Sequence, residues 1–314
     1  MKKNNNIFSN SNRNKKRAKP NVKRAFLLMV ACLVIFGSFN KVKAYVDETI
    51  KEKQEEKVAE QKRLVAEEQK RKEEEEAKKR IIGVKHGAES YSYSAKKVSE
   101  KLKSGDYSNN GEKIVFLTFD DGTSTTVTPE ILKTLKDEDV KATFFVTGAN
   151  IERGGKAAEE LLKQEFEEGH AIANHSYSHD YRTLYPSRTL DLEAFKADFK
   201  KTDDILKRIV GPDFSTEVIR CPGGYMSWKG MDPLDEYMNA SSMAAIDWNA
   251  LNGDAEGKKK SPDELYNYAV KTSEGKEMVV ILMHDTYGKE NTAKALSQLI
   301  KYYKDNGYQF KILV

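Results

Sequence analysis

From about residue 112 to the C-terminus, short apolar runs of strand length alternate with amphipathic stretches of helical length. The apolar runs predict strands at 113–119, 141–147, 170–174, 217–221, 243–249, 278–283 and 308–313. The amphipathic stretches predict helices near 128–138, 155–168, 190–209, 262–273 and 290–306. Because strand and helix alternate, the pattern indicates βα units and a mostly parallel sheet. This α/β pattern favours a closed or partly closed (β/α) barrel, and a doubly wound open sheet is the alternative.

The N-terminal part begins with a basic tail at 1–24, followed by a mainly apolar segment at 25–44. This order is that of an export signal inserted with its N-terminus inside the cell. Two outcomes remain open. The segment either stays as a single transmembrane anchor, with the catalytic domain extracellular at the cell membrane, or is cleaved near Ala44 to release a secreted protein.

Within residues 45–85, positions 46–82 are mostly Glu, Lys, Gln, Arg and Ala, with acids and bases four positions apart. Such pairs predict a solvated helical stalk, and a disordered charged linker is the alternative. The apolar positions keep no heptad, so the sequence gives only weak support for a coiled coil. We expect residues 86–111 to be a linker leading into the domain at 112–314.

Composition and charge exclude some classes of function. The chain has 314 residues and a net charge of +4, but residues 1–24 hold nine of its basic residues and no acid. The basic excess therefore belongs to the tail and indicates no nucleic-acid partner. Only Cys32 and Cys221 are present, and Cys32 lies in the apolar segment, so we expect no disulfide between them.

Two acids end the first predicted strand of the C-terminal region, where Asp120, Asp121 and Gly122 follow residues 113–119. Asp and Gly are also ordinary turn residues, so this segment alone leaves a turn and a functional site equally open. Ligands of α/β folds collect at this end of a strand. A buried pair of carboxylates is costly unless a cation or a base compensates it.

A pair of histidines follows the predicted strand at 170–174. His175 and His179 lie four positions apart, and on one helical turn that spacing places both imidazoles on one face. A strand-end carboxylate would complete a site of two His and one Asp that leaves positions open for water, as catalytic Zn²⁺ or Co²⁺ sites require. We therefore predict a divalent metal site.

Further polar residues follow later strands. Arg220 precedes a Pro-Gly-Gly turn, and an Arg directed into an acidic site would keep a carboxylate ionised, although locally a plain turn with a surface Arg is the better explanation. Asp247 and Asp254 follow in the next segment. His284 ends a buried strand, where a neighbouring carboxylate would raise its pKa and make it a general acid.

In this order and spacing the segments resemble those of the polysaccharide deacetylases, the NodB-homology enzymes of carbohydrate esterase family four. The family pattern is Thr-Phe-Asp-Asp-Gly, His-Ser/Thr-x-x-His, Arg-x-Pro-x-Gly, an Asp/Trp segment and Leu-x-His. Here these segments stand at 118–122, 175–179, 220–224, 247–248 and 282–284. The resemblance covers about residues 112–314 and extends to bacterial peptidoglycan N-acetylglucosamine deacetylases.

The resemblance implies a distorted (β/α) barrel of about seven parallel strands with a groove at the strand tips. It also implies a role for each matching residue. The metal ligands would be Asp121, His175 and His179, with Zn or Co as the ion. The catalytic groups would be Asp120 as general base, Arg220 as its partner and His284 as the acid that protonates the departing amine. The substrate contacts would be Gly223, whose N–H would stabilise the oxyanion, together with Tyr225, Trp248 and Leu282.

One segment departs from the family pattern. Many members carry a second Asp-Trp where this chain has Asp254-Ala255. The carboxylate that tunes His284 is therefore either Asp247 or Asp254, and the sequence leaves this choice open.

These expectations combine in a metal-dependent hydrolase that removes N-acetyl groups from N-acetylglucosamine of peptidoglycan and releases acetate. An O-acetyl esterase acting on xylan or another acetylated polysaccharide would use the same residues. A glycan-binding pseudoenzyme is the third possibility, but it would be expected to lack at least one of them. The expected partners are the cell-wall polysaccharide and, through residues 25–44, the membrane, with no obligate protein partner indicated.

Overall fold

The computed structural model describes residues 22–314, and the chain divides into two units between Glu76 and Ala77. The predicted basic tail lies mostly outside the described residues. Helix α1 (Val22–Lys79), a single α-helix of 58 residues, makes up the described part of the first unit, and its last three residues belong to the second. Its apolar side chains between 26 and 42 are exposed, and this part is long and apolar enough to cross a membrane. An N-terminal signal sequence would share these properties.

The charged part of α1 continues as a helix, without a break, from the apolar part to Lys79. Acids and bases pair across one turn, as between Lys72 Nζ and Glu68 Oε1 at 2.9 Å. Exposed pairs of this kind contribute only a few tenths of a kcal/mol each, about 0.3–0.5 kcal/mol. The helix predicted over 45–85 is observed as far as Lys79. Nothing in the described residues tests the coiled coil.

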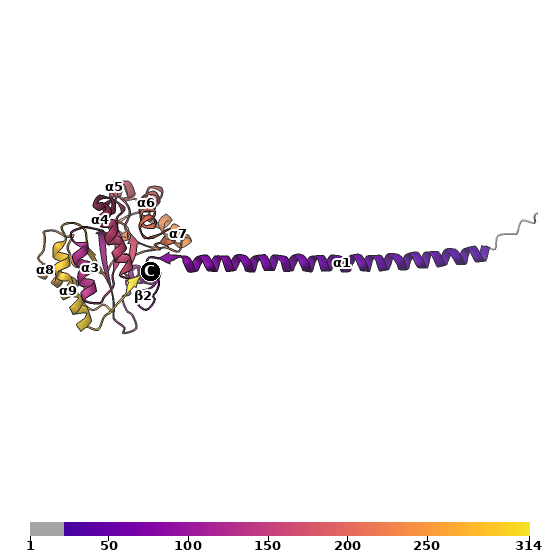
Figure 1. Ribbon diagram of the computed structural model, residues 1–314, viewed down its shortest axis with the longest axis horizontal. Helices are drawn as coiled ribbons and strands as arrows, with labels where there is room; N and C mark the ends of the chain where they lie inside the picture. The colour runs from indigo at the N-terminus through magenta and orange to yellow at the C-terminus, as the bar shows by residue number, and fades with distance from the viewer. Residues whose placement is uncertain (1–21) are drawn as a thin grey trace, which may run out of the picture. The chain divides into compact units, whose positions relative to one another are not determined.

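The second unit is built on a parallel sheet that curls into a half-barrel, which confirms the predicted fold class (Figure 1). The strands run in the order β8-β7-β5-β4-β3-β10-β9, with β11 also paired to β3. Their bounds are β3 (Ile114–Gly122), β4 (Thr143–Val146), β5 (Ala171–Asn174), β7 (Val218–Ile219), β8 (Ala244–Ala245), β9 (Ala250–Leu251), β10 (Met278–His284) and β11 (Gln309–Phe310). Among the described strands β8 and β9 end the path unpaired with each other, so the barrel is open.

The central strand β3 explains how the sheet is covered on both faces. Val115, Leu117 and Phe119 belong to the core beneath the outer helices, whereas Ile114 and Phe116 belong to a second core inside the curl. Alternate residues of a strand point to opposite faces, so a continuous apolar run fills both cores. The outer helices are α3 (Thr128–Asp137), α4 (Gly148–Glu167), α6 (Leu192–Val210), α8 (Pro262–Ser273) and α9 (Glu290–Asp305).

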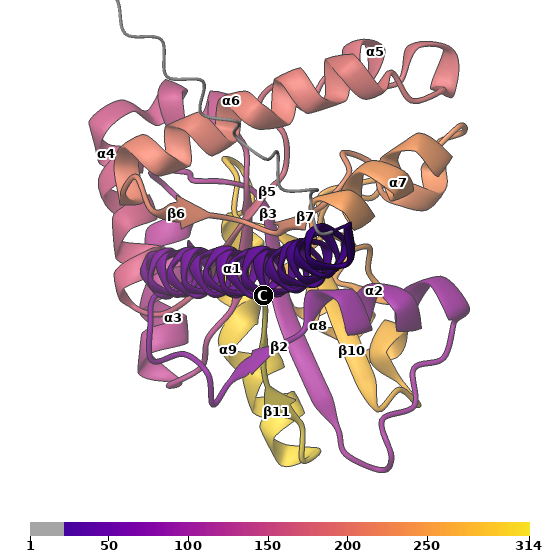
Figure 2. The same cartoon turned by 90° about the vertical axis from the view of Figure 1, so that its right-hand side faces the viewer.

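The segment expected to be a linker at 86–111 packs into this second unit. It contains β2 (Ser92–Tyr93), which pairs with β12 (Ile312–Leu313), and α2 (Ala95–Ser104), whose Ala95 and Val98 lie in the inner core (Figure 2). Just before it, β1 (Ile81–Ile82) pairs with β6 (Phe214–Ser215). The compact unit thus begins well before residue 112.

Most predicted elements are confirmed, with four differences. The strand predicted at 243–249 is only β8, at Ala244–Ala245, and the unexpected β9 follows it at Ala250–Leu251. Helix α4 begins at Gly148 rather than 155 because it consists of two helical segments joined at Gly155, whose φ of 58° is left-handed. The strand predicted at 308–313 divides into β11 and β12, which pair with different strands. Helix α7 (Asp232–Ala240) and the short helical turns α5 (Tyr181–Leu184), η1 (Pro186–Arg188) and η2 (Tyr225–Ser227) were not expected.

Candidate active site and metal centre

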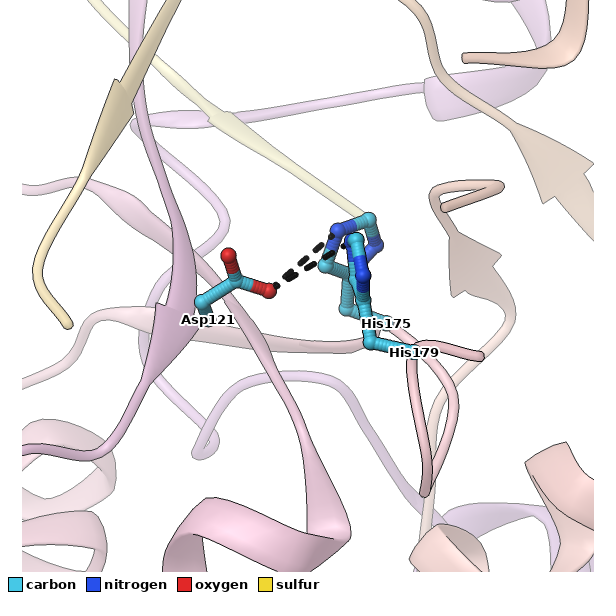
Figure 3. A group of neighbouring side chains, drawn as sticks. All are labelled: Asp121, His175 and His179. Carbon is cyan, nitrogen blue, oxygen red and sulfur yellow. Dashed lines mark ion pairs between the residues drawn. The ribbon is translucent and has the colours of Figure 1, made fainter. Parts of the chain in front are cut away.

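Three predicted metal ligands meet at the C-terminal edge of the sheet. Asp121 lies near the end of β3, and His175 and His179 lie in the loop after β5 (Figure 3). The Nε2 atoms of both histidines lie 3.7 Å from Asp121 Oδ1, and one ligand atom from each residue lies within 4.8 Å of the others. Four-coordinate ions with ligand bonds of about 2.0–2.2 Å place ligand atoms roughly 3.3–3.6 Å apart.

Asp121 Oδ1 and His175 Nε2 both lie in surroundings that favour the binding of a cation. Asp121 Oδ1 is buried and has no hydrogen-bond partner among the described residues, which is costly unless a cation compensates it. His175 Nδ1 lies 2.8 Å from the Arg220 carbonyl oxygen, which can only accept, so Nδ1 carries the proton and Nε2 is free to bind a metal. Burial lowers the pKa of His175 to about 3, although the charge of Asp121 opposes this shift, so the imidazole is neutral.

The helical turn expected for His175–His179 is wrong. The two residues lie in a loop, in which Ser176 and His179 have left-handed φ values of 74° and 50°, and α5 begins only at Tyr181. The loop brings the imidazole rings to 5.0 Å between centroids without a helix. The two histidines four positions apart therefore meet through a loop rather than a helix. Side chains accept the backbone N–H groups that a helix would have paired with carbonyl oxygens.

Asp120 lies beside this cluster and is held by a fully buried arginine. Arg220 Nη1 donates to Asp120 Oδ1 at 2.6 Å and to Thr118 Oγ1 at 2.9 Å, while its Nε donates to the Ile246 carbonyl at 2.9 Å. These bonds fix the guanidinium and orient the carboxylate, whose Oδ2 lies 3.5 Å from His175 Nε2. Burial raises the pKa of Asp120 above its usual value, and the Arg220 charge opposes that rise.

His284 stands next to Asp120 because β10 and β3 pair in parallel with these two residues opposite each other. Its partner is Asp254, whose Oδ1 lies 2.7 Å from His284 Nδ1 and whose Oδ2 accepts the His284 backbone N–H at 2.9 Å. Thr292 Oγ1 donates to the same carboxylate at 2.7 Å. Burial lowers the pKa of His284, but the hydrogen bond and charge of Asp254 outweigh it and raise that pKa to about 9.

Asp247 takes a different position. Its Oδ1 accepts the Tyr225 backbone N–H at 2.8 Å, and its Oδ2 accepts that of Met226 at 3.3 Å. Asp247 and Tyr225 line a separate cavity beside α2, and Trp248 lines both cavities. Of the two carboxylates left open by the sequence, Asp254 is therefore the one that contacts His284.

One cavity of about 380 Å³ joins most of the predicted site. Its lining includes the predicted residues Asp120, Asp121, His175, His179, Gly223, Trp248, Asp254, Leu282 and His284. The sequence analysis missed Tyr181 and Glu256, which also line it. The sole signal for Tyr181 was its place two residues after His179, and Glu256 had none beyond its nearness to Asp254.

Comparison with known proteins agrees with this geometry. Residues 107–232 match the polysaccharide deacetylase family. The chain is 33% identical over 205 residues to an uncharacterized 30.6 kDa protein of Geobacillus stearothermophilus, covering 64% of this chain and 70% of that protein. It is 30% identical over 213 residues to a Bacillus cereus peptidoglycan-N-acetylglucosamine deacetylase, covering 65% of this chain and 71% of that protein.

A solved structure covers a larger share of the chain than these two relatives do. A Streptococcus mutans CE4 esterase superposes with a TM-score of 0.68 and 36% identity, covering 74% of this chain and 98% of that one. Sequence, fold and the arrangement of acids and histidines in the cavity thus lead to one conclusion. The chain belongs to the polysaccharide deacetylase family of enzymes.

Proposed function

We propose that the enzyme hydrolyses the acetamide of N-acetylglucosamine in peptidoglycan and depends on a divalent metal, Zn²⁺ or Co²⁺. The observation that carries this proposal is the set Asp121, His175 and His179 beside Asp120 and His284 in one cavity. The name of the B. cereus relative supports the choice of glycan. Two imidazoles and one carboxylate are the donor set of a catalytic site with an open position.

The chain's own residues account for the proton transfers. A divalent ion held by Asp121, His175 and His179 would supply a Lewis acid and lower the pKa of water. Asp120, oriented by Arg220, takes a proton from the water that attacks the acetamide carbonyl carbon. His284 gives its proton to the amine nitrogen as the C–N bond breaks, so that acetate and a free amine leave.

The residues that line the cavity are consistent with the proposed substrate, which carries an acetyl group. Trp248 and Leu282 line the cavity beside the proposed catalytic groups and offer apolar surface for the acetyl methyl. Gly223 also lines it, with a φ of 77°, and its backbone N–H is the proposed donor to the developing oxyanion. Tyr225, which lines the neighbouring cavity, is a candidate contact for the rest of the glycan.

The product identifies the reaction. The full-length enzyme should be incubated with peptidoglycan fragments, N-acetylglucosamine oligomers and acetylated xylan, and the products analysed by mass spectrometry. Loss of acetyl with a new free amine on glucosamine supports the proposal. A new hydroxyl and an unchanged acetamide would identify an O-acetyl esterase instead, and unchanged substrates would identify a binding protein.

The roles of the two adjacent aspartates are separable by metal content. Asp121→Asn removes a proposed ligand and should lower the amount of bound metal. Asp120→Asn leaves the three ligands untouched, so it should retain the metal while turnover falls by about 10²–10⁴. Equal metal loss in both variants would contradict the division of roles.

We also propose that α1 anchors the enzyme, with the catalytic unit outside the cell. Its apolar exposed surface at 26–42 and the preceding basic tail support this topology. An anchored protein stays with membranes through high-salt washing, because salt removes electrostatic binding and not a buried span. Recovery of a soluble protein that starts near Tyr45 would show a cleaved signal instead.

The catalytic unit is proposed to start near residue 77, because α2 contributes Ala95 and Val98 to the inner core. A fragment of residues 77–314 should unfold cooperatively and retain activity on soluble oligosaccharides. A fragment starting at 112 should not, since it exposes the apolar surface that α2 covers. Full activity of the shorter fragment would contradict this boundary.

A further inference from the structure

The loop that carries His175 and His179 is shaped by side chains. Five consecutive backbone N–H groups, from residue 176 to residue 180, donate to side-chain oxygens. The acceptors are Asn174 Oδ1, Asp198 Oδ1 for two of the five, Ser176 Oγ and Ser178 Oγ. Backbone N–H groups that form neither helix nor sheet must find such partners when they are shielded from water.

Asp198 differs from the other acceptors because it comes from outside the loop and its strand. It lies on α6, its side chain is buried, and its Oδ1 accepts the Tyr177 N–H at 2.7 Å and the Ser178 N–H at 3.1 Å. One oxygen atom thus ties the middle of the loop to the helix packed beneath it.

The two histidines depend on this tie to different extents. His175 directly follows β5, donates its backbone N–H to the Val146 carbonyl, and has its ring fixed by the Arg220 carbonyl. His179 lies beyond the tied residues and has a φ of 50°, a conformation that non-glycine residues adopt only when their surroundings impose it. Release of the loop would therefore displace His179 before His175.

We propose that Asp198 is a positioning residue for the metal centre. Its Oδ1 holds Tyr177 and Ser178 so that His179 Nε2 stays 3.7 Å from Asp121 Oδ1. This inference rests on the proposed metal role of Asp121, His175 and His179. Side chains that orient ligands in this way typically change metal affinity by about 10–100-fold when they are removed.

The test measures Zn²⁺ affinity of the full-length enzyme by competition with a chelating indicator, without substrate. Asp198→Ala removes the oxygen that accepts both N–H groups and should weaken Zn²⁺ binding by about 10–100-fold. Asp198→Asn keeps an oxygen that can accept both N–H groups, so its affinity should stay within about threefold of wild type. Asp204→Ala is the matched control, because Asp204 lies on the same helix but is exposed and pairs with Lys200.

A second readout reports on the ligands themselves. The Co²⁺-loaded Asp198→Ala variant should show the weakened visible absorption bands of a site that has lost one imidazole, resembling His179→Ala, whereas Asp198→Asn should keep the wild-type spectrum. Wild-type Zn²⁺ affinity in Asp198→Ala, with only its melting temperature lowered, would overturn the proposal. An asparagine variant as weak as the alanine variant would also overturn it. If the alanine variant does not fold, Asp198→Ser, whose hydroxyl is too short to span both amides, replaces it.

These outcomes are distinguishable from failure of the proposed function. An enzyme that binds Zn²⁺ and releases no acetate would contradict the proposed reaction, while the ratio of metal affinities would still report on Asp198. A wild-type enzyme without measurable Zn²⁺ binding would overturn both inferences.

Discussion

Two histidines lie near the same pair of aspartates, His175 just after β5 and His284 at the end of β10, yet only one of them is charged. His175 is buried and directs Nδ1 to a backbone carbonyl, so burial dominates and its pKa falls to about 3. His284 directs Nδ1 to the Asp254 carboxylate at 2.7 Å; although burial lowers its pKa, that carboxylate raises it to about 9. The partner of Nδ1 thus separates a neutral imidazole, the proposed metal ligand, from a charged imidazole, the proposed proton donor.

The largest expected effect is a difference in metal content between variants of two regions, the proposed metal site at His175 and His179 and the proposed proton donor His284. His179→Ala removes a ligand from the first region, so the enzyme should lose both metal and turnover. His284→Ala removes only the proton donor and should retain metal while turnover falls by about 10²–10⁴. Metal analysis together with steady-state kinetics checks this prediction. Metal loss from the His284→Ala variant would contradict it, because His284 would then also be needed for metal binding.

The next effect is on stability of the metal-free protein. The pKa of His284 is about 9 in the folded state against an unfolded value near 6.5, so its protonation stabilises the fold. That contribution, about 3 kcal/mol, is fully present below pH 6.5 and lost as pH rises through 9. Urea unfolding at pH 6 and pH 10 should show the difference between wild type and His284→Asn shrinking by that amount. A pH-independent difference would contradict the raised pKa.

A smaller effect concerns the pH profile. Asp254→Asn removes the charge that raises the pKa of His284, so the alkaline limb of turnover should move from about 9 to 6.5 or below. At pH 8 the protonated fraction of His284, and with it turnover, should then fall by about 30-fold. Turnover measured from pH 5 to pH 10 checks this prediction, and an unmoved alkaline limb would assign it to another group.

The smallest effect is expected at the other candidate carboxylate. Asp247 binds the backbone N–H groups of Tyr225 and Met226 rather than His284. Because an Asn oxygen can still accept the Tyr225 N–H, Asp247→Asn should leave the alkaline limb in place and change turnover by no more than about threefold. A shift of the limb equal to that of Asp254→Asn would show that both carboxylates act on His284.

Local pattern was enough to predict much of the fold. Apolar runs and amphipathic stretches encode periods of two and 3.6 residues, which are properties of neighbouring positions, and the α/β class follows from their alternation. The same reasoning located Asp120, Asp121 and His284, because in parallel α/β folds polar residues that end buried strands share one edge. It failed for the loop at 175–179, since a spacing of four suits a helical turn as well as a loop built by side chains.

Long-range contacts were decided by the tertiary structure. His284 and Asp254 lie 30 positions apart and meet because β9 pairs with β10, a neighbour relation that strand order decides and no local period encodes. Asp198 reads in the sequence as one more acid on an amphipathic helix, and only the packing of α6 beneath the histidine loop gives it two N–H groups to accept. The sequence by itself therefore determined which residues end the strands, and the tertiary structure decided which of them touch and carry charge.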